Sequence, residues 1–135
     1  MMTLALGNTV IKQEYLINAP ISEVWRALTD VQYINSWGGG PANMDGNVGT
    51  DFSLWGGDIY GKNIEVLLDK KLEQEWYGGD WAEPSFVTFS LVDQNGRTKV
   101  TLEHKNVPEA EVEDFEAGWR DFYMGPLKSY LESKK

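Results

Sequence analysis

His104 is the only histidine among the 135 residues, and the chain contains no cysteine. Thiol catalysis, disulfides and cysteine-ligated metal sites are therefore excluded, and a serine nucleophile would have to use His104 as its base. No serine lies in a recognisable nucleophile-elbow motif. His104 shares strand parity with Val100 and Leu102, which predicts that its side chain faces the covered side of a sheet. There it could act as a general base, orient a bound ligand, or be a structural histidine whose nitrogens are satisfied.

Two further patterns resemble reactive sites but lack what such sites need. Glu73 and Glu75 lie on one side of a predicted strand, opposite Trp76, which favours exposure to solvent over a paired acid and base. The three glycines at 38–40 lack a following Gly-Lys-Ser/Thr, and Pro41 after them offers no amide to a phosphate, so they indicate a connector. The carboxylates show no calcium-loop spacing. We therefore expect no enzymatic activity, no metal site and no cofactor.

Aromatic side chains dominate the C-terminal segment from Pro108 onward. Its apolar residues recur at steps of three and four, at Val112, Phe115, Trp119, Phe122 and Pro126, with a second row at Tyr123, Leu127 and Tyr130. This spacing predicts one long helix with a broad aromatic face, about 36 Å in length at about 1.5 Å per residue. Pro126 cannot donate to the carbonyl of Phe122, so we expect a bend there.

The residues before this helix supply a surface for it to cover. Alternating patterns predict strands at 9–17, 50–55, 58–68, 71–77, 86–93 and 97–105, and helical spacing predicts short helices at 21–28 and 31–37. Gly56-Gly57 predicts a two-residue hairpin turn, and Asn95-Gly96 is the strongest hairpin signal. We predict an α+β helix-grip fold over residues 1–135 as a single domain. In it a curved antiparallel sheet wraps around the long C-terminal helix, with two short helices after the first strand.

Composition limits the possible partners. The formal charge of −9 argues against binding nucleic acid and anionic membranes. No apolar run is long enough to insert into a membrane, and residues 1–6 lack the basic start of a secretory signal. From these features we expect a cytoplasmic monomer.

Several short sequence motifs, taken in their order along the chain, resemble the C-terminal domain of activators of the Hsp90 ATPase and their single-domain homologues, within the START-like (Bet v 1-like) superfamily. The matching pieces are Ala19-Pro20-Ile21-Ser22-Glu23-Val24-Trp25, Leu28-Thr29-Asp30, Met44-Asp45-Gly46, Val48-Gly49, Phe52-Ser53-Leu54-Trp55-Gly56-Gly57, Ile59-Tyr60-Gly61, Glu75-Trp76, Val87-Thr88-Phe89, 98–102, Val107-Pro108 and Gly118-Trp119. The resemblance spans nearly the whole chain. It implies the helix-grip fold and commonly an apolar cavity between helix and sheet. In the two-domain activators a separate N-terminal domain contributes much of the ATPase stimulation, and its motif does not occur in these 135 residues.

Three functions follow from these observations. The first is binding of a small apolar molecule between the helix and the sheet, with Trp37, Phe52, Trp76, Phe89, Leu102, His104, Phe115, Trp119 and Phe122 as the binding residues. In this hypothesis His104 fixes the polar part of the ligand, and the rings of the helix form a lid over a hollow. The alternative is that the same rings fill an ordinary core and leave no cavity. The second is a protein-interaction module that acts on a chaperone ATPase of the Hsp90 type. The third is a cyclase-like enzyme of the same fold.

Overall fold

The computed structural model describes residues 10–78 and 81–134. Its strands are β1 (Val10–Ile17), β2 (Asp51–Leu54), β3 (Ile59–Leu67), β4 (Lys71–Gly78), β5 (Ser85–Gln94) and β6 (Arg97–Lys105). Its helices are α2 (Ile21–Thr29), α3 (Val31–Trp37), α4 (Val112–Gly118) and α5 (Gly125–Ser133), with short helical segments η1 (Trp55–Gly57), η2 (Glu109–Glu111) and η3 (Trp119–Met124). The predicted α+β helix-grip fold is confirmed.

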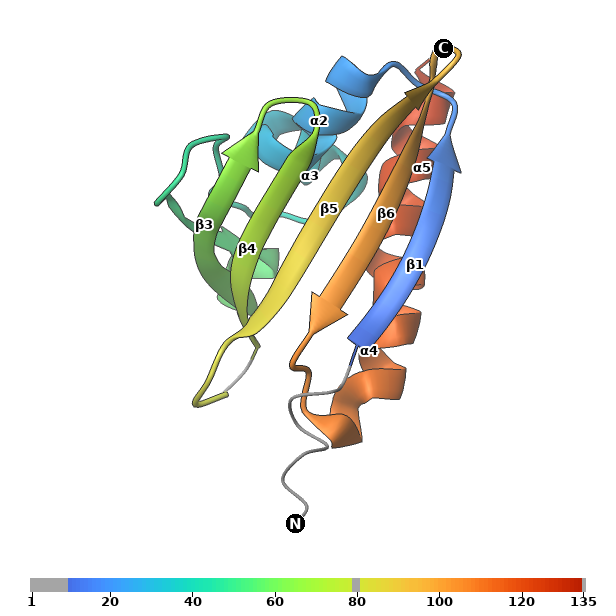
Figure 1. The fold of residues 1–135 in the computed structure, drawn as a ribbon. Helices are drawn as coiled ribbons and strands as arrows, with labels where there is room; N and C mark the ends of the chain where they lie inside the picture. The colour runs from blue at the N-terminus through green and yellow to red at the C-terminus, as the bar shows by residue number, and fades with distance from the viewer. Residues whose placement is uncertain (1–9, 79–80, 135) are drawn as a thin grey trace.

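All six strands form one antiparallel sheet in the order β1-β6-β5-β4-β3-β2. Strands β2 to β6 follow one another as a meander, whereas β1 pairs with β6, so the first and last strands are neighbours. The sheet curves around the C-terminal helix, which lies behind β6 and β1, while α2 and α3 cover the upper part of the same face (Figure 1). That face is therefore closed by helices from both ends of the chain.

The hairpins differ in how closely they follow the sequence pattern. Gln94 pairs with Arg97 across Asn95-Gly96, whose φ angles of 59° and 91° make the predicted two-residue turn. The predicted two-residue turn at Gly56-Gly57 is wrong in length. There the last pair is Leu54 with Ile59, and the four residues between them include the short helical segment η1.

Strand β3 contains a bulge at Ile64. Asn63 pairs with Gln74 and Glu65 pairs with Glu73, which leaves Ile64 as an extra residue in β3. A bulge of this kind increases the local twist and bend of a strand. Both Asn63 and Gln74 are buried on the helix-covered face of the sheet.

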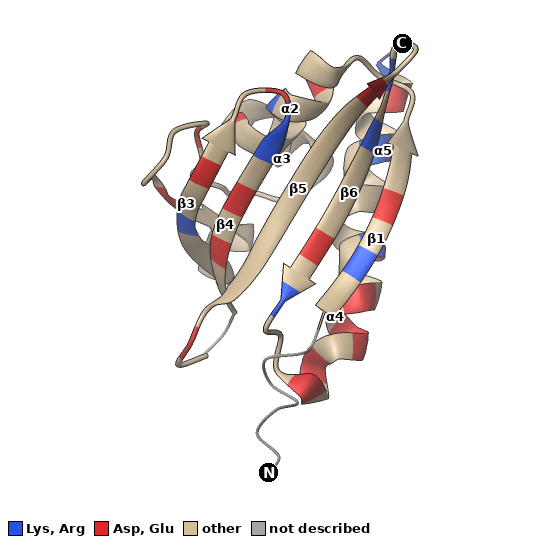
Figure 2. Cartoon of the chain, in the orientation of Figure 1, with Lys and Arg blue, Asp and Glu red and all other residues tan. Residues whose placement is uncertain are grey.

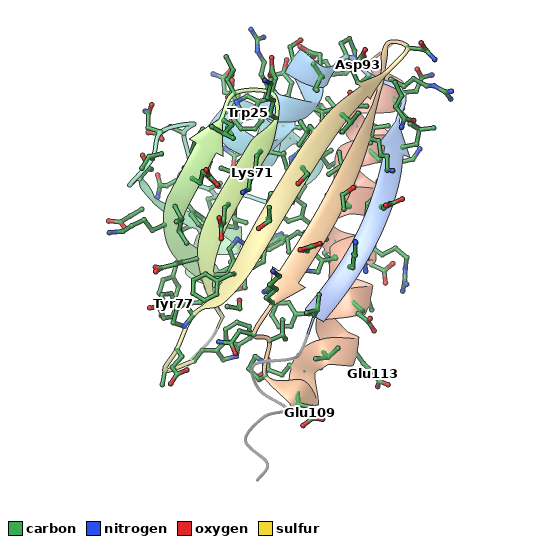
Figure 3. All side chains as sticks on the ribbon, in the orientation of Figure 1. Trp25, Lys71, Tyr77, Asp93, Glu109 and Glu113 are labelled. Carbon is green, nitrogen blue, oxygen red and sulfur yellow. The ribbon has the colours of Figure 1, made fainter. Side chains whose placement is uncertain are left out.

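The opposite face of the sheet is polar and open to solvent. Lys71 and Tyr77 of β4 project from it toward the viewer in Figure 3. Charged residues of both signs are distributed over β1, β3, β4 and β6 (Figure 2), and the ammonium of Lys71 lies 2.8 Å from a carboxylate oxygen of Glu65. Residues on the inner face of β4, β5 and β6 are buried at every second position. The prediction of which side chains face the covered side of these strands is thus confirmed.

The C-terminal helix runs from Glu109 to Ser133 and changes its winding in the middle. Segment η3 is a π-helix, and the amide of Gly125 donates to the carbonyl of Arg120, five residues earlier. We call this π-helical segment the wide turn. It ends directly before Pro126, whose ring would clash with the carbonyl of Phe122 in a regular helix. A Cβ atom at position 125 would lie 2.2 Å from the Arg120 carbonyl oxygen, so the wide turn depends on glycine there.

The wide turn changes which residues face the sheet. More residues occupy each turn of a π-helix, so the fourth residue after Trp119 returns to the sheet side and the third does not. Tyr123 is accordingly 1% exposed and Phe122 is 66% exposed. The expectation that Phe122 packs against the sheet is wrong.

Within residues 10–78 and 81–134, no helix has the length and hydropathy to cross a bilayer.

Candidate functional site

A pocket of about 330 Å³ lies between the C-terminal helix and the end of the sheet formed by η1 and β3. Its lining residues are Trp55, Ile59, Trp76, Asp114, Phe115, Gly118, Trp119, Phe122 and Tyr123. Trp76, Trp119 and Tyr123 are buried and form its floor, whereas Asp114 and Phe122 are exposed and form its rim. The pocket is therefore an open groove lined mainly by aromatic rings.

The rings of the floor are packed against one another. The indoles of Trp76 and Trp119 stack with their centroids 4.7 Å apart, and Tyr123 lies 4.7 Å from Trp119. Behind them Tyr123 is 4.6 Å from Trp37 and 5.6 Å from Phe89, again between ring centroids. The rings of Trp119 and Tyr123 thus fill the space between the C-terminal helix and the sheet. The pocket lies beside these rings and not between them and the sheet.

His104 lies behind the floor with both ring nitrogens bonded. The indole N–H of Trp119 donates to Nδ1 over 3.0 Å, so in the neutral ring the proton sits on Nε2. Nε2 then donates to Oγ of Ser85 at 2.7 Å, and the Ser85 hydroxyl donates to the Trp76 carbonyl at 3.2 Å. Burial lowers the pKa of His104 from 6.5 to about 3. His104 is thus a neutral residue that fixes the orientation of Trp119.

A second chain of hydrogen bonds holds the other floor tryptophan. The indole N–H of Trp76 donates to Oε1 of Gln74 at 2.8 Å, and Nε2 of Gln74 donates to Oδ1 of Asn63 at 2.9 Å. Nδ2 of Asn63 then donates to the carbonyls of Asp45 and Asn47. The bulge in β3 places Asn63 for this contact, and every member of the chain is satisfied inside the protein.

The hydroxyl of Tyr123 differs from the other polar groups near the pocket. Among the described residues it is the only buried side-chain nitrogen or oxygen without a hydrogen-bond partner. Burial raises the pKa of Tyr123, so the phenol stays protonated and remains a donor. A buried hydroxyl without a partner costs free energy, and this one presents no accessible surface to the pocket.

Gly118 forms an open part of the pocket wall. Its backbone is helical, with φ −62° and ψ −41°, and a Cβ atom built there meets nothing within 4 Å. A methyl group at this position would border the pocket without a clash. Position 118 therefore allows the pocket to be filled from the helix while the core behind it is unchanged.

The rim of the pocket is acidic. Asp114 contributes to the lining, and the neighbouring carboxylates of η2 and α4 make this end of the helix negative (Figure 2). Glu109 and Glu113 point away from the sheet (Figure 3). An anionic ligand would be repelled on approach, whereas a neutral or cationic one would not.

The pocket includes four of the nine residues predicted from sequence, namely Trp76, Phe115, Trp119 and Phe122. The other five, Trp37, Phe52, Phe89, Leu102 and His104, are buried in the core behind the floor and do not line the pocket. Tyr123 belongs to the second apolar row predicted from the sequence. Trp55, Ile59, Asp114 and Gly118 are further lining residues that the sequence does not predict. Helical spacing gives Phe122 and Tyr123 similar claims to the sheet side, since they follow Trp119 by three and four residues, and the π-helical turn decides in favour of Tyr123.

The ionisable groups in the pocket lining are Asp114 and Tyr123. Asp114 is exposed, and the Tyr123 phenol is held neutral by burial. In the part of the chain that the structure describes, no group of three or more His, Cys, Asp or Glu side chains could hold a metal ion. The lining accordingly offers a molecule in the groove mainly aromatic and apolar surface.

Comparison with known proteins gives a consistent picture. The family model of the activator of Hsp90 ATPase homolog 1-like protein matches residues 18–132. The chain is 25% identical over 118 residues to the human activator of 90 kDa heat shock protein ATPase homolog 1, covering 86% of this chain and 35% of the relative. It thus spans about a third of the length of the curated relatives it matches.

Two solved structures extend the comparison. An HSP90 activator from Plasmodium falciparum is 25% identical, with a TM-score of 0.86 over 93% of this chain and 97% of the other. DynU16, from the dynemicin biosynthetic locus, is also 25% identical, with a TM-score of 0.79 over 93% of this chain and 48% of that one. The same fold therefore occurs in proteins linked to a chaperone ATPase and to a biosynthetic locus.

Proposed function

The chain belongs to the family of activator of Hsp90 ATPase homolog 1-like proteins, and from this premise we propose that it binds a small, largely apolar molecule in the pocket beside its C-terminal helix. The observation that supports the proposal is the open groove walled by aromatic rings next to a filled core. A volume of about 330 Å³ lies at the lower end of the range typical of small-molecule sites. We propose a binding function without catalysis.

The contacts of the lining support binding by shape. The indole N–H groups of Trp76 and Trp119 are engaged by Gln74 and His104, so they are not free to bind a ligand. Ring faces then supply most of the attraction, through apolar burial and stacking. A ligand of about twenty heavy atoms, at about −0.3 kcal/mol each, would bind with about −6 kcal/mol, which corresponds to tens of micromolar.

Catalysis receives less support from the same geometry. The histidine that a cyclase-like reaction would use is buried and bonded at both nitrogens. Its lowered pKa, about 3, makes it a poor proton acceptor near neutral pH.

Gly118 allows a direct test of the pocket. We would titrate the neutral naphthalene dye prodan into the unmodified protein, Gly118→Leu and Gly118→Ala, and follow the dye's fluorescence and the amide resonances near Trp119. Leucine extends into the open space at position 118 and should block binding, whereas alanine adds one methyl group and should preserve it. Thermal unfolding of each variant checks that the fold is intact. Equal binding by all three proteins, or none by the unmodified one at millimolar dye, would rule the pocket out.

Regulation of an Hsp90-type ATPase is the second candidate function, and the matched relatives favour it, because the human protein is named as an activator of such an ATPase. The test is to add the chain to a purified Hsp90-type ATPase and to measure both co-sedimentation and the rate of ATP hydrolysis. A saturable increase in rate would support the regulatory role, and an unchanged rate with no complex at high concentration would reject it.

Light scattering from the chain alone gives its molar mass in solution and so tests the prediction that it is a monomer.

A further inference from the structure

We propose that two copies of this chain pair through strand β1, an edge strand of the sheet, so that the two sheets become one. The partner is a second copy, bound antiparallel to the first across a two-fold axis at Gln13. The inference concerns a surface other than the pocket and does not rest on the function proposed above. It departs from the monomer expected from the sequence.

Strand β1 leaves one side of its backbone unpaired. Among the described residues it pairs with β6 alone, whereas the shorter edge strand β2 is also joined by a bridge between Asn43 and Ser53. The C-terminal helix lies behind β1 (Figure 1), where Gln13 donates to the carbonyl of Glu116. Edge strands with no bulge and no proline tend to pair with another chain, and residues 10–17 contain neither.

The backbone groups that point outward from β1 belong to every second residue. Gln94 and Arg97 close a two-residue turn as a hydrogen-bonded pair, which fixes the direction of the peptide groups in β6. The even-numbered residues of β6 then bond to β1, where their partners are Ile11, Gln13, Tyr15 and Ile17. The N–H and C=O groups that point away from β6, toward a second copy, are those of Val10, Lys12, Glu14 and Leu16.

These four residues are complementary to the same four residues in reverse order. In an antiparallel pair centred on Gln13, Lys12 of one copy lies opposite Glu14 of the other, and Val10 lies opposite Leu16. All four lie on the exposed face, with Val10 49% and Leu16 40% exposed. Opposite charges and apolar side chains that face each other across two strands are favourable. A shift of two residues either way would place Lys12 opposite Lys12, or Glu14 opposite Glu14, so one register is preferred.

The charges of β6 extend this pattern. The ammonium of Lys12 lies 3.7 Å from a carboxylate oxygen of Glu103, and that of Lys99 lies 3.7 Å from one of Glu14. In the joined sheet Lys12 and Glu14 would each have an opposite charge on both neighbouring strands. The formal charge of −9 on each copy opposes association, so we expect a weak dimer that forms at high protein concentration.

Exchange of the two charges tests the register. We would measure dimerisation by sedimentation equilibrium, up to about millimolar protein, for the unmodified chain, Lys12→Glu, Glu14→Lys and the double variant. Each single change places like charges opposite each other and should weaken dimerisation about tenfold, whereas the double variant should restore it. A mixture of the two single variants should form mixed dimers, because each then meets opposite charges in the other.

Two controls separate this contact from general effects of charge. Lys62→Glu, on the exposed face of β3 beside Asp51, changes the net charge as Lys12→Glu does and should lose much less dimerisation. Glu14→Lys lowers the net negative charge, so a loss of dimerisation there cannot come from general repulsion. Thermal unfolding of each variant checks that the fold is intact.

Amide hydrogen exchange tests the surface itself. As the protein concentration rises, the amides of Lys12, Glu14 and Leu16 should become protected, whereas those of Ile11 and Tyr15 should be protected at every concentration. A dimer that leaves the first three amides unprotected would overturn the proposal, because it would use another surface. A monomer at every concentration would also overturn it, and would leave the edge available to an extended segment of a different protein. Binding of prodan is measured separately, so neither result bears on the pocket.

Discussion

His104 should make the stability of this protein fall as the pH drops below about 6.5. In the folded chain burial lowers the pKa of His104 to about 3, whereas the ordinary value of 6.5 applies when the chain unfolds. The unfolded state therefore binds one more proton than the folded state between these two values. The contribution of His104 is complete above pH 6.5 and is lost progressively as the pH falls toward 3.

The size of the effect follows from the displacement of the pKa. Each pH unit within this window changes the free energy of unfolding by about 1.4 kcal/mol. Acidification from neutral pH to about pH 4.5 should therefore cost about 2 to 3 kcal/mol from His104 alone. The groups that surround the ring are Ser85, Trp76, Phe115 and Trp119, none of which titrates in this range.

Urea denaturation at pH steps from 7.5 to about 4.5 would measure this dependence in the unmodified protein and in His104→Gln. The variant should be less stable at neutral pH, because Trp119 and Ser85 lose their partner, and its stability should depend less on pH. Carboxylates such as Asp45, whose pKa is lowered by the Thr50 hydroxyl and the Asn47 amide, affect both proteins alike and cancel in the difference.

An NMR titration of the unmodified protein provides a check that needs no variant. The imidazole resonances of His104 should not shift between pH 7.5 and about 4.5 while the fold persists. A titration midpoint near 6.5 in the folded protein, or equal pH slopes for the two proteins, would refute the assignment of His104 as a buried neutral residue.

Three further predictions concern the helix and the polar chain beneath the pocket, each measured as the change in free energy of unfolding in urea. Gly125→Ala should destabilise the protein by about 1 to 3 kcal/mol, because the new methyl group meets the Arg120 carbonyl at 2.2 Å. Gly118→Ala lies in a regular helical turn with open space, so it should instead stabilise the protein by about 0.5 to 1 kcal/mol. If both substitutions changed the free energy of unfolding in the same direction, the wide turn at Gly125 would be contradicted. Asn63→Ala should cost about 1 to 3 kcal/mol, because Gln74 loses its acceptor, and a neutral effect would show that the chain contributes nothing.

The sheet could be predicted from sequence because its signals are local. Alternation along a strand fixes which side chains share a face, and this correctly placed Gln74, Trp76 and His104 on the covered side. Asn95-Gly96 likewise fixed the register of β5 and β6, since a two-residue turn leaves one pairing. The long helix followed from its apolar period.

The pocket could not be predicted in detail because its geometry depends on contacts between distant segments. A regular helical period was assumed through Pro126, and the wide turn before it exchanged the roles of Phe122 and Tyr123. The bulge at Ile64 has no local signature, although it places Asn63 beneath Gln74. The sequence pattern therefore predicted the aromatic surroundings of the pocket but not that Tyr123 forms part of its floor.

The open space beside Gly118 separates the shape of the pocket from the packing of the core. Its backbone is already helical, and a Cβ atom added there meets nothing within 4 Å, so alanine fits without altering the sheet or the buried rings. The size of the pocket and the packing of the core thus depend on different positions. Substitution at this one site is a natural starting point for engineering altered selectivity.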